Sequence, residues 1–419
     1  MDSRQKAGSR PIAAAFLTPS WPADAAANGI VTYVEAISAA LRQLGHAPCI
    51  LSAHTKAGIT PNPAASGVYP LNQEDRPMLS RMLDAIAFRL DPLTALRRKF
   101  SRALVRAARR AMAERPVELL EMEETFGLVQ LVKPRLPIPI VVRLHGPHFV
   151  NGVAAGVPND AAFRARVRYE GVGIARADAV SAPSLDILER TRTRYRLPLS
   201  EAVVIGCPAP VIPPDRRWRL ADCDRERILF VGRFDRHKGG DVTIDCFRGV
   251  ARRFPNVRLW FAGRDEGLID DEGRRWKLAH YLAERAPEVA ERVDWLGSPS
   301  DSALRDLRRR AFLTIVASRY ENFPMVVLEA MAHACPLAAT RAGGIAEIAE
   351  DGVNCLLARP GDPEDLANTV SRLLADPELA ARLGQRAGED ALRRYHPETI
   401  ARQTAAFHES VLKNRSGAA

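Results

Sequence analysis

The chain has 419 residues, of which 47% are hydrophobic and 26% are charged. This composition is that of a globular protein and excludes a disordered or fibrous one. The six cysteines are scattered without metal-like spacing, which is typical of a reducing compartment rather than of a disulfide scaffold. Neither an apolar run of 18 residues nor a signal-peptide core occurs, so we expect a soluble cytoplasmic protein.

In the first half of the chain, short apolar runs alternate with helical patterns. Residues 11–19 read as a buried strand, Asn28-Gly29-Ile30 opens a helix that ends at Gly45, and residues 47–52 read as the next strand. Further strands are predicted at 128–132, 138–143, 179–182 and 203–205. This succession is typical of a parallel α/β sheet.

The positive charge of the chain, +10 in total, is concentrated in its first half. Nine basic and two acidic residues lie between Arg89 and Arg115, where Asp91 and Pro92 predict the start of a helix. One face of that helix would carry Arg98, Arg102, Arg106 and Arg109. Such a face suits an anionic membrane surface or plain solvent, and both readings stay open. Nucleic-acid binding is not expected, because no aromatic residues interleave with the arginines.

A proline-rich, charged stretch at 207–227 has the profile of a linker, and the alternation restarts after it. Strands are predicted at 228–231, 257–262, 293–296 and 312–316, and helices at 242–253, 276–286 and 326–334, before a helical tail from about residue 376. We therefore predict an α/β protein of two consecutive doubly wound, Rossmann-like domains facing a central cleft lined by the loops that follow strands.

The strongest local signal is 228-ILFVGRFDRHKGGD-241, in which a strand ends at Gly232 and a loop leads to a helix. Arg233 and Lys238 flank that loop, and both side chains suit phosphate oxygens. The glycines and the helix N-terminus suit the approach of an anion. Taken alone, the stretch is also compatible with an ordinary charged surface loop.

Two further segments carry candidate ligand-binding groups. In 321-ENFPMVVLE-329 the two glutamates are eight residues apart, so both face one cleft if a helix begins near Pro324. Carboxylates accept hydrogen bonds from sugar or ribose hydroxyls. In 340-TRAGGIAEI-348 paired glycines precede a helix, where they either expose backbone donors or serve only a tight turn.

His145 follows the strand at 138–143 closely, in 145-HGPH-148. A side chain at this place is expected to face a ligand in a parallel sheet, although a lone histidine is more often structural. His145 and His148 have no third ligand at suitable spacing, so no metal site is predicted.

The order of these features resembles the retaining, nucleotide-sugar-dependent glycosyltransferases of family 4, which have the GT-B architecture. The resemblance is carried by GRFDRHKG, by SRYENFPMVVLEAMA with its E-x7-E element, and by AGGIAEIAEDGVNCLLARPGD. It departs from the family pattern at Asn28-Gly29, where the family often has two glycines, and at Ala334, where a glycine is common. It also departs at 205-IGCPAPV-211, where the family usually has proline–asparagine–glycine–valine–aspartate. It implies an acceptor-binding domain over 1–209, a donor-binding domain over 210–395 and a C-terminal helix, 396–419, that packs back on the first domain.

The resemblance also implies roles for single residues. Arg233 and Lys238 would hold the donor diphosphate, Glu321 would contact the sugar hydroxyls and Glu329 the ribose. His145 would lie beside the reactive face of the sugar, where it would hydrogen-bond O6 or stabilise developing charge. The remaining donor-binding positions implied are Gly29, Gly232, Gly263, Arg264, Asn322, Phe323, Pro324, Gly343 and Gly344.

The function implied is a retaining hexosyltransferase of cell-surface polysaccharide, lipopolysaccharide or glycolipid assembly. It would use a UDP- or GDP-sugar and need neither metal nor cofactor. Its partners would be a carbohydrate or lipid-linked acceptor and an anionic membrane surface that meets the region Arg97–Arg110, with the protein peripheral on the cytoplasmic face. The alternatives are a phosphorylase or epimerase of the same architecture and a nucleotide-sugar-binding protein without turnover.

Overall fold

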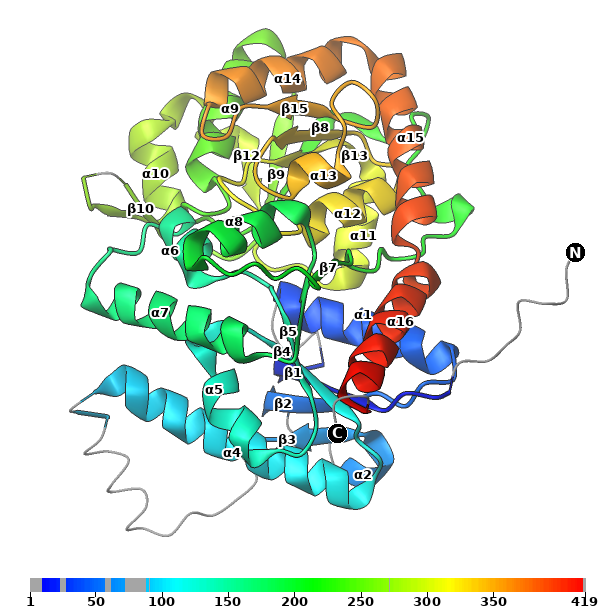
Figure 1. Ribbon diagram of the computed structural model, residues 1–419. Coiled ribbons are helices and arrows are strands. Elements are labelled where there is room, and N and C mark those ends of the chain that lie inside the picture. Colours follow the sequence, from blue (N-terminus) through cyan, green and yellow to red (C-terminus); the bar gives the residue numbers. More distant parts are fainter. Residues whose placement is uncertain are drawn as a thin grey trace, which may run out of the picture.

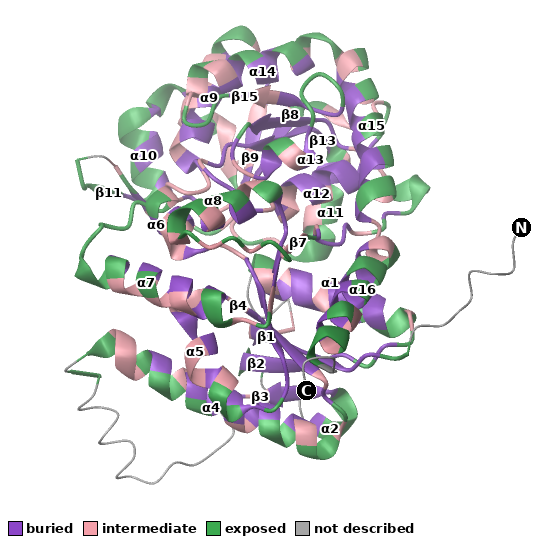
Figure 2. Ribbon diagram, in the orientation of Figure 1, coloured by how far each residue is buried: buried purple, intermediate pink, exposed green. Residues whose placement is uncertain are grey.

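In a computed structural model, residues 10–22, 28–56, 62–71, 88–89, 91–270 and 272–416 are described. They form two lobes, each built on a parallel sheet with helices packed around it (Figure 1). The strands are the most deeply buried elements of both lobes, and the helices are exposed on their outer faces (Figure 2). The predicted architecture of two doubly wound domains is confirmed.

The first sheet has seven strands in the order β3-β2-β1-β4-β5-β6-β7. These strands are β1 (Ala14–Trp21), β2 (Cys49–Thr55), β3 (Val68–Pro70), β4 (Leu119–Glu123), β5 (Ile140–Arg143), β6 (Ala179–Ala182) and β7 (Val203–Val204). The helices of this lobe are α1 (Gly29–Gln43), α2 (Pro63–Ser66), α4 (Pro92–Glu114), α5 (Val129–Val132), α6 (His148–Ala154), α7 (Ala161–Arg176) and α8 (Leu185–Tyr195). The strand order reverses between β1 and β4, which places a ligand crevice at the ends of these strands.

The second sheet has six strands in the order β12-β9-β8-β13-β14-β15 and reverses between β8 and β13. These strands are β8 (Asp224–Val231), β9 (Arg258–Ala262), β12 (Val293–Trp295), β13 (Ala311–Val316), β14 (Leu337–Thr340) and β15 (Leu356–Ala358), and a separate hairpin pairs β10 (Leu268–Ile269) with β11 (Arg275–Trp276). The helices are α9 (Gly240–Arg253), α10 (Leu278–Arg285), α11 (Asp301–Arg310), α12 (Met325–Ala332), α13 (Ile345–Ile348), α14 (Pro363–Ala375), α15 (Pro377–Tyr395) and α16 (Pro397–Ser416).

One predicted strand is wrong. Residues 129–132 form helix α5 with Leu128 as its N-cap, and the strand of this region is β4, Leu119–Glu123. The apolar run at 128–132 is too short for its periodicity to separate a buried helix from a strand. Glu121 and Glu123 interrupt the apolar pattern of β4, although Glu121 is only 3% exposed.

The long basic helix α4 begins as predicted, because the Asp91 side chain accepts a hydrogen bond of 3.0 Å from the backbone N–H of Thr94. Its first arginine does not belong to the exposed face, which corrects the predicted range Arg97–Arg110. Arg97 is buried, donates from Nε to the carbonyl of Phe126 at 2.6 Å, and stacks on the ring of Tyr169. The exposed basic side chains of α4 are Arg98, Lys99, Arg102, Arg109 and Arg110.

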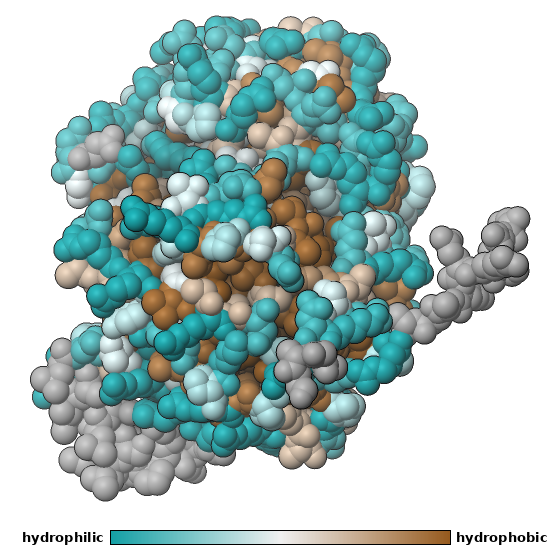
Figure 3. Space-filling model, in the orientation of Figure 1, coloured by the Kyte–Doolittle hydropathy of each residue, from teal (hydrophilic) through white to brown (hydrophobic). Residues whose placement is uncertain are grey.

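The C-terminal helix α16 leaves the second lobe and lies beside α1 in the first (Figure 1). Its apolar side chains join the core that contains Tyr33 and Ile37 of α1; these are Ile400, Ala401, Ala405, Phe407 and Val411. Most of the surface on the side shown in Figure 3 is hydrophilic, with apolar side chains gathered where the lobes meet. Among the described residues, no helix combines the length and apolarity needed to cross a membrane.

Candidate active site

The loop after β8 folds around the carboxylate of Asp235. One oxygen accepts the backbone N–H of Lys238 at 2.7 Å, and the other accepts Nε of Arg233 at 2.6 Å. Gly239 ends the loop with φ of +68°, and a Cβ there would lie 2.0 Å from the carbonyl oxygen of Ala317. Glycine is therefore required for the loop to pass this close to the end of β13. Asp235 therefore fixes the guanidinium of Arg233 and the backbone of Lys238, which lies just before α9.

Lys238 reaches across the switch point between β8 and β13. Its Nζ lies 2.6 Å from Oε1 of Glu321, and the same oxygen accepts the hydroxyl of Ser318 at 2.7 Å. Burial opposes ionisation of Glu321, but the charges of Lys238 and His237 outweigh it and hold the pKa of this carboxyl below its ordinary value. Glu321 is therefore a fixed, buried carboxylate, which suits acceptance of hydrogen bonds from hydroxyl groups.

The paired glycines after β14 bring a third loop against Glu321. The backbone N–H of Gly344 donates to the carbonyl oxygen of Glu321 at 2.8 Å. A Cβ on Gly343 would lie 2.3 Å from that oxygen, and one on Gly344 would lie 2.0 Å from the carbonyl oxygen of Asn322. Close contact between the two loops accounts for both glycines, and their contact with a donor stays a prediction.

The loops after β8 and β9 also touch. A Cβ on Gly263 would lie 1.8 Å from the carbonyl oxygen of Gly232, and the carbonyl of Arg264 accepts the N–H of Phe234 at 2.8 Å. The Arg264 side chain is half-exposed and lies 3.3 Å from Glu266. The residues predicted to surround the nucleotide thus border the loop that carries Arg233.

Helix α12 begins at Met325 with Pro324 as its N-cap, as predicted. The two glutamates of the E-x7-E element, however, are held by different cations. Glu329 forms an ion pair with Arg308 of α11, whose side chain is 3% exposed, whereas Glu321 pairs with Lys238. The structure therefore does not join them in one hydrogen-bonded cluster, and the ribose contact of Glu329 stays a prediction.

His145 follows β5 and faces α1, where its ring lies 5.2 Å from that of Tyr33 in an edge arrangement. Burial and repulsion from Arg143 lower the pKa of His145 to about 3, so the ring is neutral at physiological pH. The backbone N–H groups of His145 and Gly146 donate to the two carboxyl oxygens of Glu124, at 2.9 and 2.7 Å. Glu124, which follows β4, thus fixes the loop that carries the histidine.

Asn322 joins the two halves of the site. Its side-chain amide donates to the carbonyl of His145 at 2.8 Å and to Oδ1 of Asn151 at 3.2 Å. Asn151 lies on α6, immediately behind the His145 loop. The sugar-binding segment predicted in the second lobe therefore contacts the predicted histidine of the first lobe directly.

Gly29 and Phe323 are two further residues that were predicted to bind the donor. Gly29 begins α1 after the N-cap Asn28, and a Cβ there would meet no atom of the described residues within 4 Å. A helix N-terminus suits an anionic group, and the contact of Gly29 with a donor stays a prediction. The ring of Phe323 packs edge-on against Tyr395 at 5.6 Å, so it anchors its loop to the end of α15.

Glu124, Asn151 and Ser318 also belong to the site, although the sequence did not predict them. Glu124 directly follows a strand, which is a usable signal, but that strand was predicted at the wrong residues. Asn151 and Ser318 stand in no recognisable motif, and only the fold brings them to the site.

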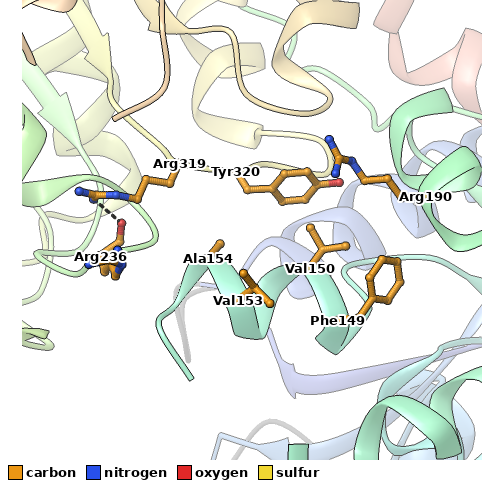
Figure 4. Close-up of a pocket in the computed structure, with 8 residues that line it drawn as sticks. All are labelled: Phe149, Val150, Val153, Ala154, Arg190, Arg236, Arg319 and Tyr320. Carbon is orange, nitrogen blue, oxygen red and sulfur yellow. Dashed lines mark hydrogen bonds between the residues drawn. The ribbon is translucent and has the colours of Figure 1, made fainter. Parts of the chain in front are cut away.

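A cavity of about 370 Å³ lies at the junction of the lobes, beside Tyr320 (Figure 4). Apolar side chains of α6 form its floor, and Arg190, Arg236 and Arg319 border it. Arg319 forms two hydrogen bonds with Asp241, and Arg190 pairs with Asp186. Since acidic partners offset two of these charges, the cavity is less cationic than its lining suggests.

Contacts beside this cavity hold the lobes together. The Tyr320 hydroxyl donates to Asp186 at 2.8 Å, and the Glu347 carboxylate accepts the first N–H groups of α8, from Leu185 at 2.8 Å and Asp186 at 2.7 Å. A carboxylate at a helix N-terminus is a favourable cap, so Glu347 of α13 links the second lobe to α8.

No group of three or more potential metal ligands is found within the part of the chain that the structure describes. The predicted independence from metal ions stays a prediction.

Two family models match the chain. One, described as glycosyl transferases group 1, covers residues 213–390, and the other, a glycosyl transferase 4-like domain, covers residues 28–208. The chain belongs to the group 1 glycosyltransferases. Both lobes of the glycosyltransferase are thus accounted for, because the boundary between the two models falls between β7 and β8.

Curated relatives and solved structures agree with this family. The chain is 30% identical over 275 residues to a D-inositol 3-phosphate glycosyltransferase of Nocardiopsis dassonvillei (61% of this chain, 62% of that one). It is 29% identical over 260 residues to mannosylfructose-phosphate synthase of Agrobacterium fabrum (59% and 56%). These alignments cover less than two thirds of each relative's own length.

Among solved structures, sucrose-phosphate synthase from Thermosynechococcus elongatus superposes with a TM-score of 0.71 at 21% identity, over 96% of this chain and all of the other. Anabaena HepE, solved in complex with UDP and glucose, gives 0.65 at 20% identity over 95% of this chain and all of that one. These likenesses show a shared GT-B fold.

Proposed function

We propose that the protein transfers a sugar from a nucleoside diphosphate donor to an acceptor, with retention of the anomeric configuration. One observation carries this proposal: Lys238 and Arg233 lie on the loop after β8, next to the buried carboxylate of Glu321 after β13. Two cations that suit a diphosphate thus lie beside a carboxylate that suits sugar hydroxyls. All three groups flank one switch point of the sheet, which is where ligands of open α/β sheets bind.

The chemistry follows from the charges of this cluster. As the bond between the anomeric carbon and the diphosphate oxygen breaks, the diphosphate leaves with the electron pair, and its growing negative charge meets Lys238 and Arg233. The acceptor oxygen attacks the same face of the sugar, and its proton passes to the departing phosphate oxygen. Glu321, kept ionised by Lys238, holds the sugar hydroxyls during the transfer.

The neutral state of the His145 ring decides between the two roles predicted for it, a hydrogen bond to the sugar and stabilisation of developing charge. With a pKa near 3 its ring carries no charge at physiological pH, so it serves as a hydrogen-bonding partner of the sugar rather than as a cationic acid. The contact between Asn322 and the His145 carbonyl sets the histidine against the sugar-binding loop.

For the donor we propose a UDP-sugar, with GDP-mannose as the rival, and turnover without a metal ion. Anabaena HepE, which shares the fold, was solved with UDP. A nucleotide-sugar panel measured by thermal shift tests this choice: a UDP-sugar should raise the melting temperature most. Stabilisation by GDP-sugars alone would contradict the donor assignment, and loss of turnover on addition of EDTA would contradict metal independence.

For the acceptor we propose a lipid-linked carbohydrate of cell-surface glycan assembly, met at the cytoplasmic face of the membrane. The exposed basic face of α4 supports this proposal, because it suits an anionic bilayer. Replacing Arg98, Arg102 and Arg109 by glutamine should weaken co-sedimentation with anionic vesicles and leave donor hydrolysis unchanged. Unaltered co-sedimentation would refute the membrane role.

A soluble phosphorylated acceptor is the competing candidate, because the two curated relatives named above are called after phosphorylated compounds. Turnover of the identified donor with phosphorylated sugars and with membrane extracts separates the two acceptor classes. Binding of the nucleotide sugar without any transfer would instead favour a binding protein. Anomer analysis of the product separates a retaining transferase from an epimerase or a phosphorylase.

A further inference from the structure

A buried polar network connects the C-terminal helix to the core of the first lobe. Glu121, in the middle of β4, accepts hydrogen bonds from the hydroxyl of Tyr33 at 2.9 Å and from Nε2 of His408 at 2.9 Å. These side chains come from α1, β4 and α16, and His408 is separated from Glu121 by 287 residues. All three residues are at most 3% exposed.

Arg143 balances the charge of this network. Its guanidinium lies 4.1 Å above the ring of Tyr33, and Nη2 donates to the carbonyls of Ile205 at 2.8 Å and Gly206 at 3.1 Å. Ile205 and Gly206 follow β7 at the start of the segment that connects the two lobes. Hydrogen bonds from His408 and Tyr33, with the charge of Arg143, keep the pKa of Glu121 below its ordinary value despite burial. Glu121 and Arg143 are therefore a buried, compensated pair of charges.

Tyr33 carries the network to His145. Its hydroxyl is fixed by Glu121 and one face of its ring by Arg143, while the ring meets the imidazole of His145 at 5.2 Å. The backbone of His145 is fixed separately, by Glu124 and Asn322. Rotation of the imidazole about its side-chain bonds is limited by the packing of Tyr33 against it.

We propose that His408, Glu121 and Tyr33 are positioning residues, through which α16 fixes the imidazole of His145 in the orientation used for sugar transfer. The proposal rests on the proposed function of His145. The C-terminal helix thereby takes part in the activity of the opposite lobe and does more than cover its core. A displacement of about 1 Å at a reacting group can cost about 100-fold in rate, so loosening the ring should lower kcat.

Stability alone gives a poor account of this arrangement. A protein in which apolar residues of similar volume replace a buried ion pair is often as stable as the original or more stable. Stability of the core therefore does not require Glu121, Arg143 and His408. The network instead gives Tyr33 one defined position, which an apolar core enforces less strictly.

The test compares three variants of α16. His408→Leu removes the donor to Glu121, His408→Gln restores an N–H donor, and Val411→Ala weakens the packing of the same helix without touching Glu121. We expect His408→Leu to lower kcat by about 10-fold or more while the donor KM changes less than about 2-fold. His408→Gln should recover most of the loss, and Val411→Ala should keep the wild-type kcat.

A spectroscopic measurement keeps the inference separable from the proposed function. In protein labelled with 13C at histidine rings, the His145 C–H resonances, identified with a His145→Gln variant, should shift in His408→Leu and in Tyr33→Phe but not in Val411→Ala. Unmoved His145 resonances in a folded His408→Leu variant, or an equal loss of kcat in Val411→Ala, would overturn the inference. If the wild type transfers no sugar, the proposed function fails, and the resonances still decide whether α16 orients His145.

Discussion

The ion pair between Lys238 and Glu321 allows the sharpest prediction about catalysis. Replacing Lys238 by methionine keeps the length of the side chain and removes its charge. Nζ of Lys238 lies 2.6 Å from Glu321 at the point where the diphosphate is proposed to leave. The variant therefore loses one fixed cation from the transition state, while Glu321 keeps its hydrogen bond from the hydroxyl of Ser318.

The size of the effect follows from the geometry. A unit charge about 4 Å from the departing oxygen contributes about 4 kcal/mol at an effective dielectric constant of about 20. Removal of a single donor from an oxyanion site typically costs about 2.7–4 kcal/mol. Because the Lys238 side chain is 25% exposed and partly screened, we place the loss at the lower end. The value of kcat should therefore fall by about 100-fold.

The assay is release of the nucleoside diphosphate from the donor at saturating concentration, with Kd of UDP measured by calorimetry. Lys133→Met provides a control, because Lys133 forms an exposed ion pair with Asp178 at 2.9 Å on the other lobe. This control should keep the wild-type kcat. A folded Lys238→Met enzyme that turns over at more than about a tenth of the wild-type rate would contradict the proposed role of Lys238 in stabilising the departing diphosphate.

Three further outcomes are expected. Gly344→Ala should slow turnover and destabilise the protein, because the added Cβ would meet the Asn322 carbonyl. Gly29→Ala should keep the wild-type stability and raise only the donor KM. Steady-state kinetics and thermal melting of both variants would check these expectations. Ala334 adopts a left-handed φ of +56°, which glycine tolerates better than alanine. Ala334→Gly should therefore raise the free energy of unfolding, measured in urea, by about 0.5 kcal/mol. A lower free energy of unfolding would contradict this prediction. Burial beside Glu170 and Glu123 raises the pKa of Glu124 from 4.5 to about 8, so the folded state retains a proton that the unfolded state releases. Stability should therefore fall as pH rises from about 5 to 8, and Glu124→Gln should flatten this slope in urea unfolding across that range.

The donor-binding half of the site was predictable from the sequence because its residues are local. The loop 232–239 and the segment 321–329 each follow a strand and precede a helix, so their place at the sheet edge follows from the alternation of elements. Lys238 and Glu321 were each predicted as site residues, but their direct contact spans 83 residues and no local pattern indicates it. Pairing of Glu329 with Arg308 was equally beyond prediction, because it depends on how α11 packs beside α12.

The half of the site around His145 shows what local patterns leave out. Asn322 contacts the His145 carbonyl across 177 residues, and His408 reaches Glu121 across 287. Buried polar residues at such separations have no periodicity to mark them, and Glu121 interrupts the apolar pattern of the very strand that carries it. Ala334 illustrates the reverse case: the sequence marks it as a departure from the family's glycine, and its left-handed φ gives the physical reason for that glycine.

A structure of the protein with bound UDP is the decisive test of whether Lys238 and Arg233 hold the donor diphosphate. We expect the two phosphates to lie between the Lys238 ammonium and the Arg233 guanidinium, with the carboxylate of Glu321 facing the place of the sugar. A nucleotide bound elsewhere, or phosphates that touch neither cation, would contradict this expectation.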